Sequence, residues 1–236
     1  MSASRLPKIC VYCGGTENLT KEHAPPKLIY PKPRPQKLIT VWACEFCNSD
    51  GSKDAEYFLQ CLCLHPRAKS TPIAEAIKPT FHRAMNRPDA IKRKVAFIST
   101  LTPTQSGFLI DVDVKRLHLV VERTVQCLYF HEFGKRIPDN YEATAMGEAF
   151  LQSLEPDQIR QFHEDFTIPL GRLKRKAVGN EAFSYCFIHG EDEFVSMWCL
   201  MFYGAMPFIV VTGQRIRPLP PRSVNKVALL ASPATK

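Results

Sequence analysis

Two closely spaced cysteine pairs constrain the fold of this chain more than any other feature of its sequence. Cys10 and Cys13 form one C-x-x-C pair, and Cys44 and Cys47 form a second. A two-residue gap lets both thiolates of a pair reach one ion from a tight turn, and Gly14-Gly15 after the first pair favours such a turn. Four thiolates suit tetrahedral zinc, so we expect one structural zinc ion held by all four cysteines.

The other cysteines do not suggest a second metal site. They stand in apolar stretches and are typical of small core residues: Cys61, Cys63, Cys127, Cys186 and Cys199. Residues 1–9 lack an apolar core of signal-peptide length, so we expect a cytoplasmic protein whose cysteines stay reduced. Chance pairing of buried cysteines is the alternative explanation for the two C-x-x-C pairs.

The positive charge is concentrated in one part of the chain. The formal net charge is +8, and residues 61–94 contain eight basic and two acidic side chains, whereas residues 95–236 contain fifteen of each. This excess favours a polyanionic partner such as nucleic acid, and a solvated helix face explains it equally well. A composition of 45% hydrophobic residues excludes long disorder and collagen-like structure.

The pattern of apolar residues predicts an α+β fold, with helices packed on a mostly antiparallel sheet. Short strands and loops are expected over residues 8–48. Helices are expected from Asn48 or Ser49 to about Leu64, and at residues 73–86, 114–133 and 157–166. Strands are expected at residues 94–99, 108–112, 183–188, 194–203 and 208–212. The apolar stretch 194–211 approaches the length of a membrane span, but Gly204 and Pro207 predict a turn between two buried strands instead.

A carboxylate, a histidine and a distant asparagine form a second candidate site. Glu22 and His23 stand between the two cysteine pairs, and Asn48 follows the second pair directly. Adjacent residues on a strand point to opposite sides, so Glu22 and His23 can share a site only at a kinked strand end. The Pro25-Pro26 dipeptide that follows favours such a kink.

These residues together resemble the HNH endonuclease family of the ββα-metal fold, in its subset with a four-cysteine structural zinc. The matching motifs are Cys10-x-x-Cys13, Glu22-His23-x-Pro25 and Cys44-x-x-Cys47-Asn48, followed by Lys53. The resemblance covers about residues 8–60. It implies an endonuclease that hydrolyses DNA phosphodiester bonds, with RNA left open as a substrate.

The resemblance also implies a role for each site residue. His23 would be the general base that activates water, and Glu22 and Asn48 would hold magnesium or manganese at the scissile phosphate. Lys21, Lys27 and Lys53 would contact neighbouring phosphates.

The sequence departs from the family pattern at two positions. Glu22 replaces the aspartate that many members have before the histidine. Ile39 and Thr40 stand where a middle asparagine is expected, which in the family fixes the loop that carries the histidine. The alternative function is therefore a zinc-stabilised nucleic-acid binding module whose nuclease site has decayed.

Three regions are expected along the chain. Residues 1–66 form the zinc-stabilised ββα module, residues 67–94 a basic helical connector, and residues 95–236 an α+β C-terminal domain without an assigned role. We expect no membrane partner. The sequence sets no oligomeric state, and a homodimer is compatible with it.

Overall fold

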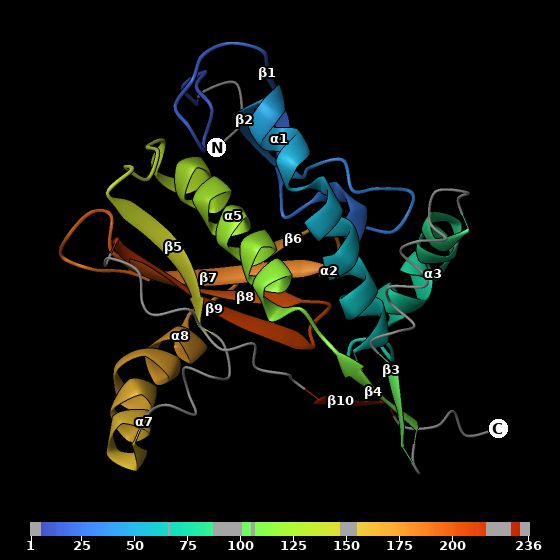
Figure 1. Cartoon of the computed structure of the whole chain (residues 1–236). Coiled ribbons are helices and arrows are strands. Elements are labelled where there is room, and N and C mark those ends of the chain that lie inside the picture. The colour runs from blue at the N-terminus through green and yellow to red at the C-terminus, as the bar shows by residue number, and fades with distance from the viewer. Residues whose placement is uncertain are drawn as a thin grey trace.

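The structure is a computed structural model that describes residues 6–65, 67–86, 101–104, 107–146, 155–215 and 228–231. Within these ranges helices and strands mix in an α+β arrangement, as the sequence predicts (Figure 1). The strands form three antiparallel sheets, in the orders β1-β2, β10-β4-β3 and β5-β9-β8-β7-β6.

A two-stranded hairpin followed by a helix makes up the N-terminal part. Strand β1 (Leu19–Ala24) pairs with β2 (Ile39–Cys44), and the helix α1 (Glu45–Asp50) follows directly. Every second residue of β2 is buried, so one face of the hairpin packs on the core. The short helix η2 (Lys27–Ile29) lies in the connection between the strands.

The helical region after β2 begins earlier than the sequence suggests. The prediction of a helix start at Asn48 or Ser49 is wrong, because α1 begins at Glu45 and Gly51 separates it from α2 (Ser52–Leu64). Cys44 occupies the N-cap position of α1 with an extended backbone, φ −67° and ψ 154°, so the helical conformation begins at the next residue. The predicted end at Leu64 is confirmed.

Helix α5 (Val114–Phe133) connects the hairpin to the large sheet. Its predicted bounds are confirmed: Asp113 accepts a hydrogen bond from the backbone of Arg116 at its start, and Gly134 ends it with a left-handed φ of +68°. The helix contacts β1, β2 and α2, and it also contacts β5 and β9 of the large sheet. One continuous core therefore includes residues of both the hairpin and the sheet, such as Val41 and Trp198.

The large sheet presents one face to α5 and the other to a helical lobe (Figure 1). The lobe consists of α7 (Pro156–Phe162), the π-helix η4 (His163–Thr167) and α8 (Ile168–Arg172). Its strands are β5 (Tyr141–Met146), β9 (Met206–Gln214), β8 (Ser196–Phe202), β7 (Phe183–His189) and β6 (Lys176–Val178). Tyr185 and Trp198 belong to the core that includes α5, whereas their neighbours Cys186 and Cys199 pack with Leu170 of the lobe. This alternation is the period of two expected of strands that are covered on both faces.

The apolar stretch 194–211 forms two strands, as predicted. Strands β8 and β9 meet at a turn where Gly204 has a φ of +65°, a conformation that glycine adopts without strain. Within the described ranges, no helix has the length and apolar character needed to cross a membrane.

The remaining elements agree with the sequence to differing degrees. The predicted strand at 94–99 lies outside the described residues. The predicted helix at 157–166 is the first part of a longer helical run. The other elements are α3 (Pro72–Met85), β3 (Leu101–Thr104), β4 (Gly107–Asp111), α7 (Pro156–Phe162), the π-helix η4 (His163–Thr167), α8 (Ile168–Arg172) and β10 (Ala228–Ala231).

Candidate functional site

The four cysteines of the two C-x-x-C pairs meet at one point. The sulfur atoms of Cys10, Cys13, Cys44 and Cys47 all lie within 4.8 Å of one another, and the sulfurs of Cys13 and Cys44 are 3.8 Å apart. An ion with tetrahedral bonds of ~2.3 Å to sulfur requires its ligand atoms to be ~3.8 Å apart. The cluster can therefore hold a metal ion such as zinc.

Backbone geometry around Cys10 favours its thiolate form. The amide of Gly14 donates to the carbonyl of Cys10 at 2.8 Å, in a turn that requires the φ of +76° at Gly14. Burial raises the pKa of Cys10, but backbone amides of Cys13, Cys44 and Tyr12 that point at its sulfur lower the pKa to about 7. A thiol that ionises near neutral pH is suited to metal ligation.

A cavity of about 240 Å³ lies between the hairpin, α1, the start of α2 and α5. Glu22, His23 and Asn48 all line it, so the structure brings these three predicted site residues together. The other polar residues of the lining are Tyr12, Lys21, Lys27, Arg34, Ser52, Arg123 and Thr124. Lys53 is not among the lining residues; its backbone carbonyl accepts a hydrogen bond from Arg116.

Glu22 projects toward the first cysteine pair and α5. The hydroxyl of Tyr12 donates to its Oε1 atom at 3.2 Å. Burial raises the pKa of Glu22, and the charge of Arg123 and the bond from Tyr12 offset part of this effect. Glu22 is thus a partly buried carboxylate with one oxygen already held in place.

His23 lies on the same strand among cationic side chains. Burial lowers its pKa, and the positive charges of Lys27, Arg34 and Lys21 lower it further. A histidine with a lowered pKa is neutral near pH 7 and can accept a proton. Thr40 stands opposite His23 in the register of the hairpin.

Asn48 is held against β1 by its amide nitrogen. The Nδ2 atom donates to Thr20 Oγ1 at 2.8 Å and to the carbonyl of Lys21 at 3.4 Å. Because the nitrogen makes these bonds, the Oδ1 oxygen is the atom of Asn48 that can meet a metal ion. The carboxylate of Glu22 and this oxygen are the hard donors that magnesium prefers.

The sequence analysis did not assign several residues of the cavity to the site, among them Tyr12, Arg34 and Arg123. Arg34 donates to the carbonyl of Lys27 at 3.1 Å, within the proline-rich connection between β1 and β2. Arg123 comes from α5, far along the chain. A signal for Arg123 exists in the sequence, because the apolar Val120 and Cys127 stand three residues before it and four residues after it, on the same side of the helical pattern of α5.

The fold and the site define an α+β protein with a cluster of four cysteines that can hold a metal ion, beside a basic cavity. Comparisons with protein-family models, with curated proteins and with solved structures find no match to this chain. A function therefore has to be inferred from the residues themselves and their geometry.

Proposed function

We propose that this protein is a metal-dependent endonuclease of the HNH type that hydrolyses phosphodiester bonds of DNA. The observation that carries the proposal is the common cavity of Glu22, His23 and Asn48. The element order β1, β2, α1, with the cysteine cluster beside it, supports a ββα-metal module. The residues that resemble the family motif are thus also neighbours in space.

The charge of the cavity favours a phosphate ligand. Four of its lining residues are cationic, namely Lys21, Lys27, Arg34 and Arg123, against the single carboxylate of Glu22. Cations that surround a cleft raise the local concentration of anions, and phosphate oxygens accept hydrogen bonds from lysine and arginine. A nucleic-acid backbone has the chemistry that such a lining recognises.

Each site residue has a defined part in hydrolysis. His23, neutral near pH 7, removes a proton from the water that attacks the phosphorus atom as the bond to the 3′ oxygen breaks. Glu22 and Asn48 would hold magnesium or manganese, and the bound ion would supply positive charge beside the phosphate and the leaving oxygen. Lys21, Lys27 and Arg34 bind and orient the phosphate groups.

The test is relaxation of supercoiled plasmid with magnesium or manganese. The wild-type protein should nick or cut the plasmid, and His23→Ala should lower the rate at least ~100-fold, because a general base contributes that much. His163→Ala is the matched control, since His163 is exposed on the helical lobe. Equal supercoil loss with wild type and His23→Ala, or none with either across several metals and DNA forms, would exclude the nuclease.

The second candidate is a nucleic-acid binding module without nuclease activity. Thr40 opposite His23 favours it, because the asparagine that fixes the histidine loop in the family pattern is missing. The two candidates differ in one measurement. Binding of DNA in a gel-shift assay, together with no cleavage in the presence of any divalent metal, would support the binding module.

A further inference from the structure

We propose that Tyr12 and Arg123 are positioning residues that orient Glu22 and Asn48 for the divalent ion. Through them the cysteine cluster and α5 together would set the geometry of the metal ligands. This inference rests on the proposed function, since it concerns the same pair of ligands. It also gives residues of the C-terminal region a part in the site.

Tyr12 connects the cysteine cluster to Glu22. It stands between the cluster residues Cys10 and Cys13, and its hydroxyl donates to Glu22 Oε1 at 3.2 Å. The same hydroxyl lies 3.2 Å from the sulfur of Cys127. The phenol has a single proton, so Cys127 is the donor of that second contact.

Arg123 holds Tyr12 and the second cysteine pair at the same time. Its guanidinium carbon lies 3.9 Å from the centre of the Tyr12 ring, and its Nη2 donates to the carbonyl of Cys47 at 2.6 Å. Cys47 directly precedes Asn48. Arg123 thus contacts Tyr12, which is hydrogen-bonded to Glu22, and Cys47, which precedes Asn48 in the sequence.

The absence of a side chain at Gly51 leaves room for the side chain of Arg123. A Cβ atom at Gly51 would lie 2.8 Å from Arg123 Nε and 3.1 Å from its guanidinium carbon, closer than these atoms normally approach. The break between α1 and α2 is therefore where Arg123 passes. This close approach explains why a glycine suits the position better than a residue with a side chain.

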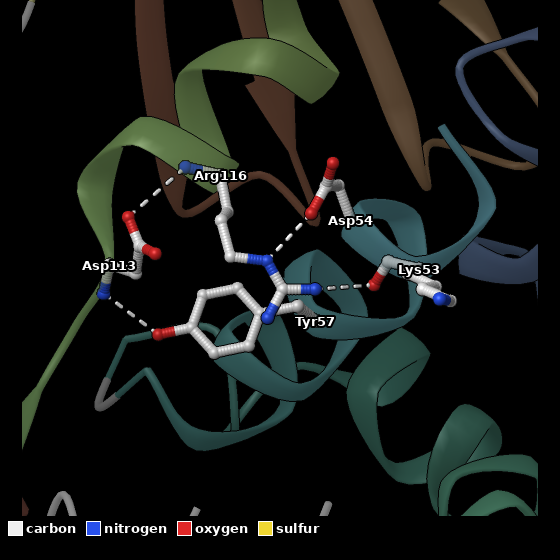
Figure 2. A network of polar contacts seen from close by, with 5 residues as sticks. All are labelled: Lys53, Asp54, Tyr57, Asp113 and Arg116. Atoms are coloured by element: carbon white, nitrogen blue, oxygen red, sulfur yellow. Dashed lines mark hydrogen bonds and ion pairs between the residues drawn. The ribbon is translucent and has the colours of Figure 1, made fainter. Parts of the chain in front are cut away.

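Arg116 provides an internal comparison, because it lies two helical turns before Arg123 on the same face of α5. Its guanidinium carbon is 4.3 Å from the centre of the Tyr57 ring, and it donates to the carbonyl of Lys53 at 2.8 Å (Figure 2). Arg116 also pairs directly with Asp54 at 2.6 Å. That network docks α5 on α2. In the cavity, Glu22 instead receives its hydrogen bond from Tyr12, which leaves the carboxylate available to an ion.

The experiment measures binding of manganese to the full zinc-loaded chain by electron paramagnetic resonance. Wild type should bind manganese at a site that Glu22→Gln abolishes. Tyr12→Phe, which removes only the hydroxyl, should weaken this binding about 10-fold, the lower end of the usual effect of an outer-shell partner. Arg123→Lys should weaken it similarly while it keeps the positive charge near Glu22.

Tyr57→Phe and Arg116→Lys are the matched controls, since they alter the same kind of contact outside the cavity. They should leave manganese affinity unchanged, and all four variants should retain their zinc. Manganese affinity in Tyr12→Phe equal to that of wild type would overturn the inference, even if Arg123→Lys did not fold. Loss of zinc from Tyr12→Phe, or a wild type without a manganese site that depends on Glu22, would overturn it too. Glu22-dependent manganese binding that Tyr12→Phe weakens, in a protein that cuts no DNA, would support the inference and refute only the proposed nuclease.

Discussion

At the scale of single residues, the charges of three cations lower the pKa of His23. Lys21 and Lys27 lie near it in the sequence, Arg34 belongs to the proline-rich connection, and all three line the same cavity as His23. The charges favour a neutral imidazole and also attract an anion to the same place. The same three side chains thus favour the neutral His23 that a general base requires, and they also attract the phosphate of the proposed substrate.

Lys27→Gln and Arg34→Gln should each weaken DNA binding through loss of a phosphate contact. In a His23→Ala background, which prevents cleavage, each substitution should lower the slope of log affinity against log salt by about 0.9, the value for one phosphate contact on duplex DNA. Fluorescence anisotropy on a mixed-sequence duplex measures this. Lys135→Gln is the control, because Lys135 is ion-paired with Glu193 away from the cavity. An unchanged slope in both variants would refute the phosphate contacts.

At the scale of elements, α5 is the helix that packs against both the hairpin and the large sheet. Its C-terminal end is bound to the sheet by Glu132, which accepts hydrogen bonds from Tyr185 of β7 and Lys176 of β6, both at 2.5 Å. Burial raises the pKa of Glu132, but these partners lower it more, so the net pKa is below the ordinary 4.5. The ionised form of Glu132 is therefore the form that the folded protein favours.

Glu132→Gln should destabilise the protein at neutral pH but not in acid. A carboxylate whose folded pKa lies below its unfolded pKa stabilises the fold above the unfolded value, and this stabilisation is lost as the pH falls through the folded value. We expect a loss of about 1.5–3 kcal/mol in the free energy of unfolding at pH 7, typical of hydrogen bonds to a charged group. The difference from wild type should shrink below pH 4.5. Urea unfolding at several pH values measures it.

Glu193→Gln is the matched control for Glu132→Gln. Glu193 pairs with Lys135, but both side chains are more than half exposed, and exposed pairs contribute about 0–1 kcal/mol. The main-chain carbonyl of Glu193, which accepts a hydrogen bond from Tyr129, is kept in this variant. A destabilisation by Glu132→Gln that is the same at pH 7 and in acid would contradict the proposed charge dependence.

At the scale of the whole molecule, the cysteine cluster joins the segment before β1 to the end of β2 and to α1. The protein should contain about one zinc per chain by elemental analysis, because four sulfurs meet at a spacing that suits one ion. Removal of the metal with a chelator should lower the melting temperature, since the site does not exist in the unfolded chain. A metal-free protein with an unchanged melting curve would refute a structural zinc.

Two cysteine variants separate the cluster from the other thiols. Cys44→Ser removes one cluster ligand and should lose the zinc. Cys186→Ser should retain it, because Cys186 is buried among apolar residues beneath the helical lobe. Four of the five cysteines outside the cluster are buried, as the apolar stretches around them predict, and Cys63 is partly exposed.

The sequence by itself determined the features that depend on local spacing and periodicity. The two C-x-x-C pairs predicted a cluster of four cysteines that can hold a metal ion, and the apolar period of 3.6 with a following glycine predicted both ends of α5. The positions of β7, β8 and β9 in the large sheet followed from their apolar stretches. The strands β3, β5, β6 and β10 were not predicted, because they are short or polar and are specified by their partners rather than by their own pattern.

Only the tertiary structure decided which residues meet at the cavity. Tyr12 reads in the sequence as a spacer inside a cysteine pair, and Arg123 as one charge on a long helix. Their contacts exist because the packing of α5 on the hairpin brings positions 12, 22 and 123 together. Contacts between segments far apart in the chain depend on which faces pack, and local periodicity carries no information about that choice.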